Sequence, residues 1–524
     1  MKVVTAEQMG NIDQNAASIG LPTEILMENA GRKVAEETSK LAGNIVGKNI
    51  LVIAGPGNNG GDGLVAAQYL NDFGAEVTLY LCSQRSDDDK NLILVKERDI
   101  SILNVKDDEG LRGLDNKLTS SELVIDAIFG TGRSRAIEGI FKQVLERLIA
   151  EKEKNPSLFL VAVDMPSGMD ANTGAVDPSC PQANATITLG YPKPGLYNFP
   201  GAEKAGNIII ADIGIPPTLA EDIKTELLTD NWVQSILPKR PLNANKGTFG
   251  KLLVIAGSIN YIGAAYLACM GAAGTGTGLV TLSTAKSLQP ILAAKLTEVT
   301  YIPLPEAESG MISPDAISIL KKRLPEYDSI LIGCGLGQNS GVVELINSLL
   351  FSPTIDKRIS LILDADALNV ISNTPKWWQK LNSNAILTPH PGEMSRLSGI
   401  SVDNIQKDRM EIARKSAGEW QKVVVLKGAY TIIAAPDGRI RISQVANPGL
   451  ASAGTGDVLS GIIAGLVAQG LDSFEAASGG VYLHGRAGDE VRQEKGDAGM
   501  LASDLLQVLP RVIKETRQTI PAST

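Results

Sequence analysis

The first residues that could carry chemistry lie in a glycine-rich loop, within the stretch IAGPGNNGGDGLVAAQYL from Ile53 to Leu70. Gly55, Gly57 and Gly60 have the spacing of a dinucleotide-binding turn, in which glycines let backbone N–H groups approach a phosphate. The loop also contains polar side chains that a phosphate cradle does not need: Asn58, Asn59 and Asp62. Because many glycine turns are purely structural, the spacing alone leaves both readings open.

Two aspartates in the same half of the chain follow apolar runs that are typical of buried strands. Asp126 lies in LVIDA, and Asp164 ends the run LFLVAVD. A buried carboxylate without a partner is costly, and a cation or a substrate hydroxyl would remove that cost. The alternative is that each aspartate caps the helix that follows it. Together with the glycine loop, the two aspartates favour a ligand site.

A second glycine-rich loop stands in the stretch NPGLASAGTGDVLSGIIAGLVAQG. Gly454, Thr455 and Gly456 precede an apolar helix predicted from about Val458. The free N–H groups of such a helix start bind phosphate and stabilise charge that develops during its transfer. Asp457 is then placed to accept a proton from an attacking hydroxyl. The alternative is a glycine-rich start to a buried helix that Asp457 merely caps.

The elements that must position these loops form two α/β halves. Apolar runs such as NILVIAG, EVTLYLC and LVIDAIFG alternate with helical segments, which predicts a parallel sheet covered on both faces. The range 212–241 is rich in proline and polar residues, and we expect the domain boundary there. The α/β pattern then resumes, and a turn at Pro436-Asp437-Gly438 predicts a hairpin and therefore a mixed second sheet.

Composition excludes several classes of protein. A net charge of −9 gives no electrostatic case for binding nucleic acid or an anionic membrane. The four cysteines are scattered and only two histidines are present, which argues against a disulfide framework or a zinc centre. No signal peptide or membrane-spanning run is seen, so we expect a cytoplasmic protein. The strand EVTLYL is not followed by the acid that a hydride-transfer enzyme uses to hold the ribose, although Arg85 would suit a 2′-phosphate.

The motifs MENAG, PGNNGGDG, DAIFGTG and VDMPSG, in this order, make residues 1–215 resemble the NAD(P)H-hydrate epimerase domain. The resemblance implies an enzyme that interconverts the R and S forms of NADH or NADPH hydrated on the nicotinamide ring. It implies a potassium ion held by Asn59, Asp126 and Ser167, and Asp164 as the acid–base residue. The substrate-binding residues that it implies are Asn58, Asn59, Gly60, Gly61, Asp62, Gly130, Thr131, Gly132, Arg133, Ser134, Arg135, Ala136 and Asp164.

The motifs NKGTFGKLLVIAGS, LDADALN, LTPHPGEM, LKGAYT and GTGD make residues 225–515 resemble the ribokinase-like NAD(P)H-hydrate dehydratase branch. The resemblance implies ADP or ATP as phosphoryl donor, with magnesium, and Asp457 as the base. It carries over a nucleotide-binding set, Lys427, Gly428, Ala429, Tyr430, Thr431, Gly454, Thr455 and Gly456, and a hydrate-binding set, Ala264, Gly337, His390 and Asp457. His390 could equally be a packed turn residue, and Asp364 a magnesium-linked group, a substrate contact or a cap.

The sequence therefore predicts a Rossmann-like three-layer domain followed by a ribokinase-like α/β domain. We expect a bifunctional repair enzyme that epimerises NADHX and NADPHX and dehydrates the S form at the expense of ADP. An ATP-dependent form is the first alternative, and a kinase of a small alcohol is the second. The family resemblance also implies a homo-oligomer.

Overall fold

The structure is a computed structural model that describes residues 1–132, 136–351 and 358–518. The chain divides into two compact units, Met1–Ile223 and Lys224–Thr524, and each is described by itself. Within the described residues, no helix has both the length and the apolar character needed to cross a membrane.

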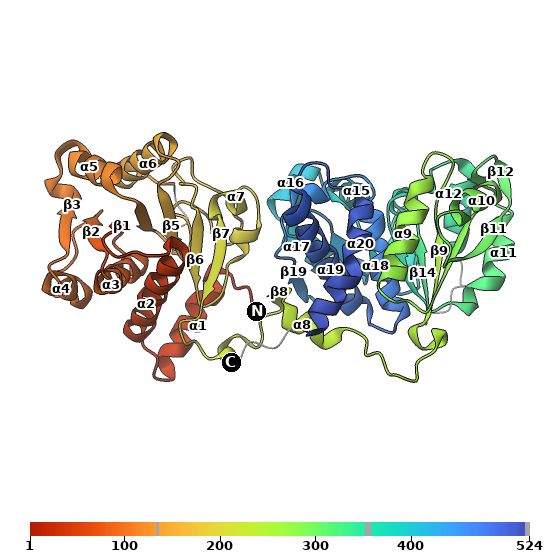
Figure 1. Ribbon diagram of the computed structural model, residues 1–524, viewed down its shortest axis with the longest axis horizontal. Coiled ribbons are helices and arrows are strands. Elements are labelled where there is room, and N and C mark those ends of the chain that lie inside the picture. Colours follow the sequence, from red (N-terminus) through yellow and green to blue (C-terminus); the bar gives the residue numbers. More distant parts are fainter. Residues whose placement is uncertain (133–135, 352–357, 519–524) are drawn as a thin grey trace. The chain divides into compact units, whose positions relative to one another are not determined.

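The first unit contains a seven-stranded parallel sheet in the order β3-β2-β1-β4-β5-β6-β7 (Figure 1). The strands are β1 Asn49–Ala54, β2 Glu76–Leu81, β3 Ser101–Asn104, β4 Leu123–Ala127, β5 Phe159–Val163, β6 Ala185–Leu189 and β7 Asn207–Ala211. The order of the strands reverses between β1 and β4. In open parallel sheets, ligands bind outside the carboxyl ends of the strands at such a switch point.

Helices cover both faces of this sheet and make the unit three-layered. One apolar cluster joins the sheet to α1 Ala6–Ser18, α2 Thr23–Ala42, α3 Asn58–Asp72 and α4 Lys90–Glu97. A second cluster joins the other face to α5 Arg112–Ser120 and α6 Gly139–Lys154. The strands are apolar along nearly their whole length because both faces are buried, as the sequence pattern predicted.

The second unit contains a ten-stranded sheet in the order β11-β10-β9-β14-β15-β16-β17-β18-β19-β8. The strands are β8 Thr225–Leu227, β9 Lys251–Ile255, β10 Leu279–Ala285, β11 Thr300–Leu304, β14 Ser329–Ile332, β15 Ser360–Leu363, β16 Ala385–Leu387, β17 Val423–Leu426, β18 Ile432–Ala434 and β19 Ile440–Ile442. Strands β17, β18 and β19 run antiparallel, so the predicted mixed sheet and its hairpin are confirmed. The polar segment after residue 223 is more than a connector, because β8 pairs with β19.

The second unit is also rich in helices. They include α8 Asp230–Ile236, α9 Ile262–Gly274, α11 Ala316–Arg323, α12 Ser340–Leu350, α13 Asp366–Ser372, α15 Pro391–Ser398, α17 Arg409–Trp420, α18 Thr455–Ala468, α19 Ser473–Lys495 and α20 Ala502–Gln518. Figure 1 shows α18 between α9 and α19. The approach of α18 to α9 needs Gly461, since a Cβ there would lie 2.1 Å from the Ala268 carbonyl oxygen.

Candidate active sites

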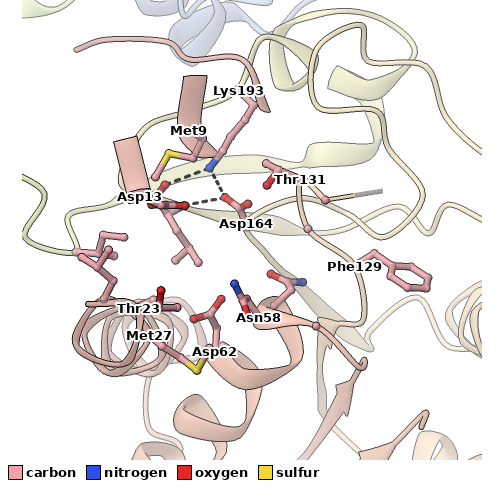
Figure 2. A pocket seen from close by; sticks show the side chains of 18 of the residues that line it. Met9, Asp13, Thr23, Met27, Asn58, Asp62, Phe129, Thr131, Asp164 and Lys193 are labelled. Atoms are coloured by element: carbon pink, nitrogen blue, oxygen red, sulfur yellow. Dashed lines mark hydrogen bonds and ion pairs between the residues drawn. The ribbon is translucent and has the colours of Figure 1, made fainter. Parts of the chain in front are cut away.

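A cavity of about 480 Å³ opens at the switch point of the first unit (Figure 2). Helices α1, α2 and α3 and the loops after β1, β4, β5 and β6 all contribute to its wall. Its polar lining includes Asp13, Thr23, Asn58, Asn59, Asp62, Thr131, Asp164 and Lys193. Residues that are far apart in the sequence thus surround one volume, as the ends of parallel strands are expected to do.

An ion pair between Asp164 and Lys193 is the central feature of this cavity. The Lys193 ammonium donates to Asp164 Oδ1, and the lysine is only 1% exposed. Asp164 Oδ1 also accepts from Leu189 N at 3.1 Å and from Thr188 Oγ1 at 3.2 Å. Asp164 itself adopts a left-handed backbone conformation, with φ of 65°, which costs energy for a residue other than glycine. One carboxylate oxygen is therefore fixed by three donors, and neither the aspartate nor its lysine caps a helix.

The other carboxylate oxygen of Asp164 lies near Asn59 and Gly130. A Cβ added at Gly130 would lie 3.1 Å from Asn59 Oδ1 and 3.4 Å from Asp164 Oδ2, so a side chain there would enter the space that these two groups share. The Nδ2 atom of Asn59 is buried and has no hydrogen-bond partner among the residues that the structure describes. A buried polar atom without a partner is rare in proteins, and here it marks a position where a ligand would complete the set.

Two further carboxyl groups face the cavity without an ion pair of their own. Figure 2 shows Asp62 projecting from α3 and Asp13 lying near Lys193. Burial raises the pKa of Asp62 well above its ordinary value, and the nearby charge of Asp164 raises it further. Burial also raises the pKa of Asp13, against the opposing effect of Lys193. The cavity thus combines a paired aspartate with two aspartates whose surroundings favour the protonated form.

Asp126 and Ser167 lie beside this cavity and do not line it. Ser167 donates to Asp126 from its backbone N at 2.8 Å and from its Oγ at 2.6 Å, and Ile128 N donates at 3.2 Å. Burial raises the pKa of Asp126 despite these bonds. The carboxylate is therefore satisfied by local donors, and the capping alternative is wrong for it.

The remaining predicted residues of the first site separate into three groups. Thr131 and Gly132 line the cavity, whereas Ala136 lines a neighbouring hollow on the other side of Gly130. Gly60 and Gly61 lie away from the lining, packed against the Gly55 carbonyl and Met27. Arg133, Ser134 and Arg135 lie outside the described residues.

Arg85, considered for a 2′-phosphate, is engaged within the protein. Its Nη1 donates to the Gly55 carbonyl at 2.8 Å, and its Nε pairs with Asp89 at 2.7 Å. Its side chain is 12% exposed, so it supports the glycine loop.

The second site lies at the start of α18. Gly454 is the N-cap residue, with φ of 91°, and Asp457 stands in the first turn without forming a capping bond. The alternative role of Asp457 as a cap is therefore wrong. Burial and the charge of Asp364 raise the pKa of Asp457 to about 6. A base with such a pKa is ionised near neutral pH and still binds a proton readily.

Asp364 follows β15 and is held by an ion pair and a hydrogen bond. Lys427 Nζ donates to its Oδ1 at 2.7 Å, and Ser460 Oγ donates to its Oδ2 at 2.7 Å. Its side chain does not cap α13, which removes that alternative. A Cβ on Gly456 would lie 3.5 Å from Lys427 Nζ, so the ammonium stands beside the first turn of α18. The helix start and the lysine together offer positive potential to a phosphate.

Glu393 and His390 extend this cluster from α15. Glu393 Oε2 lies 3.8 Å from Lys427 Nζ, and burial raises its pKa to about 7. His390 is the N-cap of α15, where its Nδ1 accepts from Gly392 N at 3.0 Å, while its side chain stays about half exposed. His390 therefore has the structural role of a turn residue and still presents a ring to solvent. The other histidine, His484, is buried in α19, where its Nε2 lies 2.9 Å from the Thr455 carbonyl oxygen.

The other residues carried over for the second site lie on loops around the same strand ends. Gly428 has φ of 144° and lies against the Arg409 guanidinium, and Thr431 Oγ1 donates to the Gly428 carbonyl at 2.8 Å. Ala429 and Tyr430 lie between them and are partly exposed. Gly337 N donates to Asp366 Oδ2 at 2.8 Å, and Ala264 lies in the first turn of α9.

Sequence reasoning missed several members of both sites. In the first unit it missed Asp13 and Lys193, and in the second it missed Glu393, Ser460 and Cys334. The run TITLGYPKPGL contains one charged residue, Lys193, and could have signalled it. A lysine is rarely fully buried without an acidic partner, so a lysine in a run that is otherwise uncharged suggests an ion pair. The other four carried no local signal.

Comparison with known proteins agrees with this arrangement. Residues 23–195 match the family model described as the YjeF-related protein N-terminus, and residues 252–511 match the model described as NAD(P)H-hydrate dehydratase. The second unit is also similar to a ribokinase-like superfamily protein from Enterococcus faecalis, with a TM-score of 0.50 and 27% identity over 56% of this chain and 98% of that one. These matches define a class in which a Rossmann-like domain precedes a ribokinase-like one.

Full-length relatives identify the family within that class. The chain is 42% identical to the bifunctional NAD(P)H-hydrate repair enzyme of Moorella thermoacetica, over 99% of this chain and 98% of the relative. It is 37% identical to the enzyme of the same description from Thermofilum pendens, over 99% and 97%. The chain belongs to the family of bifunctional NAD(P)H-hydrate repair enzymes.

Proposed function

We propose that the first unit interconverts the R and S hydrates of NADH and NADPH, and that the second unit dehydrates the S hydrate at the expense of ADP. The observation that carries the proposal is that each unit gathers carboxyl groups and a lysine beside the carboxyl ends of its strands. Hydration of a nicotinamide ring without an enzyme gives both epimers. A stereospecific dehydratase therefore needs an epimerase to clear the whole pool.

In the first unit, the hydrated ring would enter the cavity beside Asp164 and Asn59. Lys193 holds Oδ1 of Asp164, which leaves Oδ2 to exchange a proton with the hydroxyl group of the hydrate, as either ring opening or transient loss of water requires. Asp62 projects into the same cavity and its pKa is raised, so it is suited to donate the second proton that an epimerisation requires. The free N–H groups at the start of α3, after Gly57, would bind the pyrophosphate.

Potassium is part of the proposal for the first unit. The set of an amide oxygen, a carboxylate and a hydroxyl suits a hard cation. Asn59, Asp126 and Ser167 would hold the ion. Bound there, it would supply positive charge that orders the Gly130 loop and stabilises a substrate oxygen.

In the second unit, the hydroxyl of the S hydrate would lose its proton to Asp457 as its oxygen attacks the terminal phosphorus of the nucleotide. Backbone N–H groups of Gly454 to Gly456 and the Lys427 ammonium would stabilise charge on the transferred group. Phosphate then leaves with the C–O bonding electrons, the neighbouring C–H gives its proton to water, and the C–H electron pair forms the double bond of the reduced nicotinamide. Magnesium would neutralise the nucleotide phosphates beside Asp364 and Asp457, whose carboxylate oxygens suit it.

The decisive experiment is recovery of reduced-nicotinamide absorbance from a mixed R and S hydrate, with magnesium, potassium and either ADP or ATP. Complete recovery with ADP is the expected result. Recovery that stops at the S fraction would refute epimerisation by the first unit. Recovery with ATP alone would correct the donor, and a stable phosphorylated product would indicate a small-alcohol kinase. Homo-oligomer formation and a cytoplasmic location remain predictions.

A further inference from the structure

Cys334, Asp364 and Asp457 bring a thiol and two carboxylates together in the second unit. One ligand atom from each residue lies within 4.8 Å of the other two. They come from three different elements, namely the ends of β14 and β15 and the first turn of α18. Among the residues that the structure describes, one group of three His, Cys, Asp or Glu side chains lies close enough together to hold a metal ion, and it is this one.

The backbone fixes Cys334 in this position. Gly333 and Gly335 flank it with φ of 129° and 64°, and a Cβ on Gly333 would lie 1.8 Å from the Asp364 carbonyl oxygen. The loop after β14 therefore lies directly against the end of β15. Cys334 is fully buried, and its Sγ lies 3.9 Å from Asp364 Oδ2.

Charge is unbalanced around this thiol. Asp364, Asp457 and Glu393 surround Lys427, which pairs with Asp364 and approaches Glu393. Three carboxyl groups thus face one ammonium beside Cys334.

We propose that Cys334, Asp364 and Asp457 form a binding site for a thiophilic divalent cation of the zinc class, and that an ion bound there blocks Asp457 as a base. The cation forms a bond to Cys334 Sγ, and the thiol proton leaves to solvent with no change of oxidation state. Thiolate at about 2.3 Å and carboxylates at about 2.0–2.2 Å are ordinary zinc ligands. Magnesium prefers six oxygens, so the Cys334 thiol favours the thiophilic ion, which would compete with the nucleotide's magnesium for Asp364 and Asp457. Asp457 is only partly buried, which gives the ion a path of entry.

Cobalt(II) tests the binding step without reference to activity. The reduced, metal-free full-length chain is titrated with Co²⁺, and we expect a near-ultraviolet sulfur-to-cobalt absorption that saturates at one equivalent and disappears when Zn²⁺ is added. Cys334→Ser is expected to abolish the band, Cys334→Ala to do the same, and Asp457→Asn to weaken Co²⁺ binding about tenfold or more. Cys269→Ser is the matched control, because Cys269 is also fully buried but lies in α9 outside this group.

A band that persists in both Cys334 variants, or that is absent from the folded wild-type chain, would overturn the site. Circular dichroism shows whether each variant is folded. The Asp457→Asn variant keeps the Cys334 thiol, so it tests the carboxylate ligand separately.

The blocking step rests on the proposed dehydratase function and has its own test. Zn²⁺ is expected to inhibit dehydration in the presence of excess Mg²⁺, and a chelator is expected to restore the rate. Cys334→Ala should be inhibited at least tenfold less, when each protein is compared with its own rate without Zn²⁺. Cobalt binding without zinc inhibition would overturn the blocking step alone. A chain without dehydratase activity would overturn the proposed function and leave the cobalt result to decide the metal site.

Discussion

The two active sites use the same arrangement of charges in different folds. In each, a strand-end aspartate pairs with a lysine: Asp164 with Lys193 in the first unit and Asp364 with Lys427 in the second. In each, an unpaired aspartate stands near the start of a helix that follows a glycine-rich loop, Asp62 in α3 and Asp457 in α18. Burial raises the pKa of both unpaired aspartates, and neighbouring negative charge raises it further.

The difference lies in which aspartate has the proposed base role. In the second unit it is the unpaired Asp457, whereas in the first unit family resemblance assigns it to the paired Asp164. The lysines also differ, because the Lys193 side chain is 1% exposed and the Lys427 side chain is 18% exposed. The partly exposed Lys427 side chain lies beside the start of α18 and could turn toward a phosphate. The buried Lys193 side chain can only hold its aspartate. The same aspartate–lysine pair can therefore serve two purposes. It can bind a phosphate where solvent reaches the lysine, or fix the position of the aspartate where the lysine is buried.

Asp457→Asn should have the largest effect. Removal of the base is expected to lower dehydration by roughly 10³-fold, a typical contribution of general base catalysis, while epimerisation stays at the wild-type rate. The measurement is recovery of reduced-nicotinamide absorbance from the S hydrate with ADP, beside an assay of R and S interconversion. Asp437→Asn, on the exposed hairpin turn, is the matched control. Loss of both activities in Asp457→Asn would contradict the independence of the two sites.

Lys193→Met tests whether the closed pair matters for the fold. It leaves Asp164 buried without its counterion, and we expect a loss of about 3–5 kcal/mol in the free energy of unfolding of the first unit. Lys427→Met should cost less, because the Lys427 side chain is 18% exposed and the Lys193 side chain 1%. Denaturant titration measures both variants. The double variant Lys193→Met/Asp164→Asn removes the uncompensated charge and should regain part of the loss; no regain would mean that the pair is not the source of the effect.

Asp164→Asn and Asp62→Asn compare the paired and unpaired carboxyl groups of the first unit. Each is expected to slow epimerisation about a hundredfold, with dehydration of pure S hydrate unchanged. In a mixed hydrate, recovery should stop near the S fraction for both variants. An unaffected Asp62→Asn would break the parallel with Asp457 and leave Asp164 as the only acid–base group tested.

The pH dependence of dehydration should show the smallest effect. Asp457 must be deprotonated to act, and its pKa is raised to about 6, so kcat/KM should fall about tenfold per pH unit below pH 6 and stay level above it. Epimerisation does not use Asp457, so its rate should not follow the titration of this carboxyl group. The profiles are measured in one buffer series on pure S hydrate and on the R and S mixture. A fall in kcat/KM that begins only near pH 4 would show that the surroundings of Asp457 do not raise its pKa in solution.

Much of the fold could be predicted from local patterns. Apolar runs alternating with helices indicated parallel sheets covered on both faces, because a strand buried on both sides has no polar alternation. The turn at Pro436-Asp437-Gly438 indicated the antiparallel hairpin of the mixed sheet. The glycine loop before Asp457 indicated an anion site, since a helix start with small residues exposes its N–H groups. These are properties of neighbouring residues, and the sequence alone determined them.

The pairing of charges was decided only by the tertiary structure. Lys193 lies 29 positions from Asp164 and Lys427 lies 63 positions from Asp364, and no local pattern links such residues. The same holds for Cys334, which the sequence presented as one scattered cysteine and the fold places between two carboxylates. A carboxyl group's pKa depends on burial and on charges a few ångströms away, so its chemical role follows from distances through space that spacing along the chain does not contain.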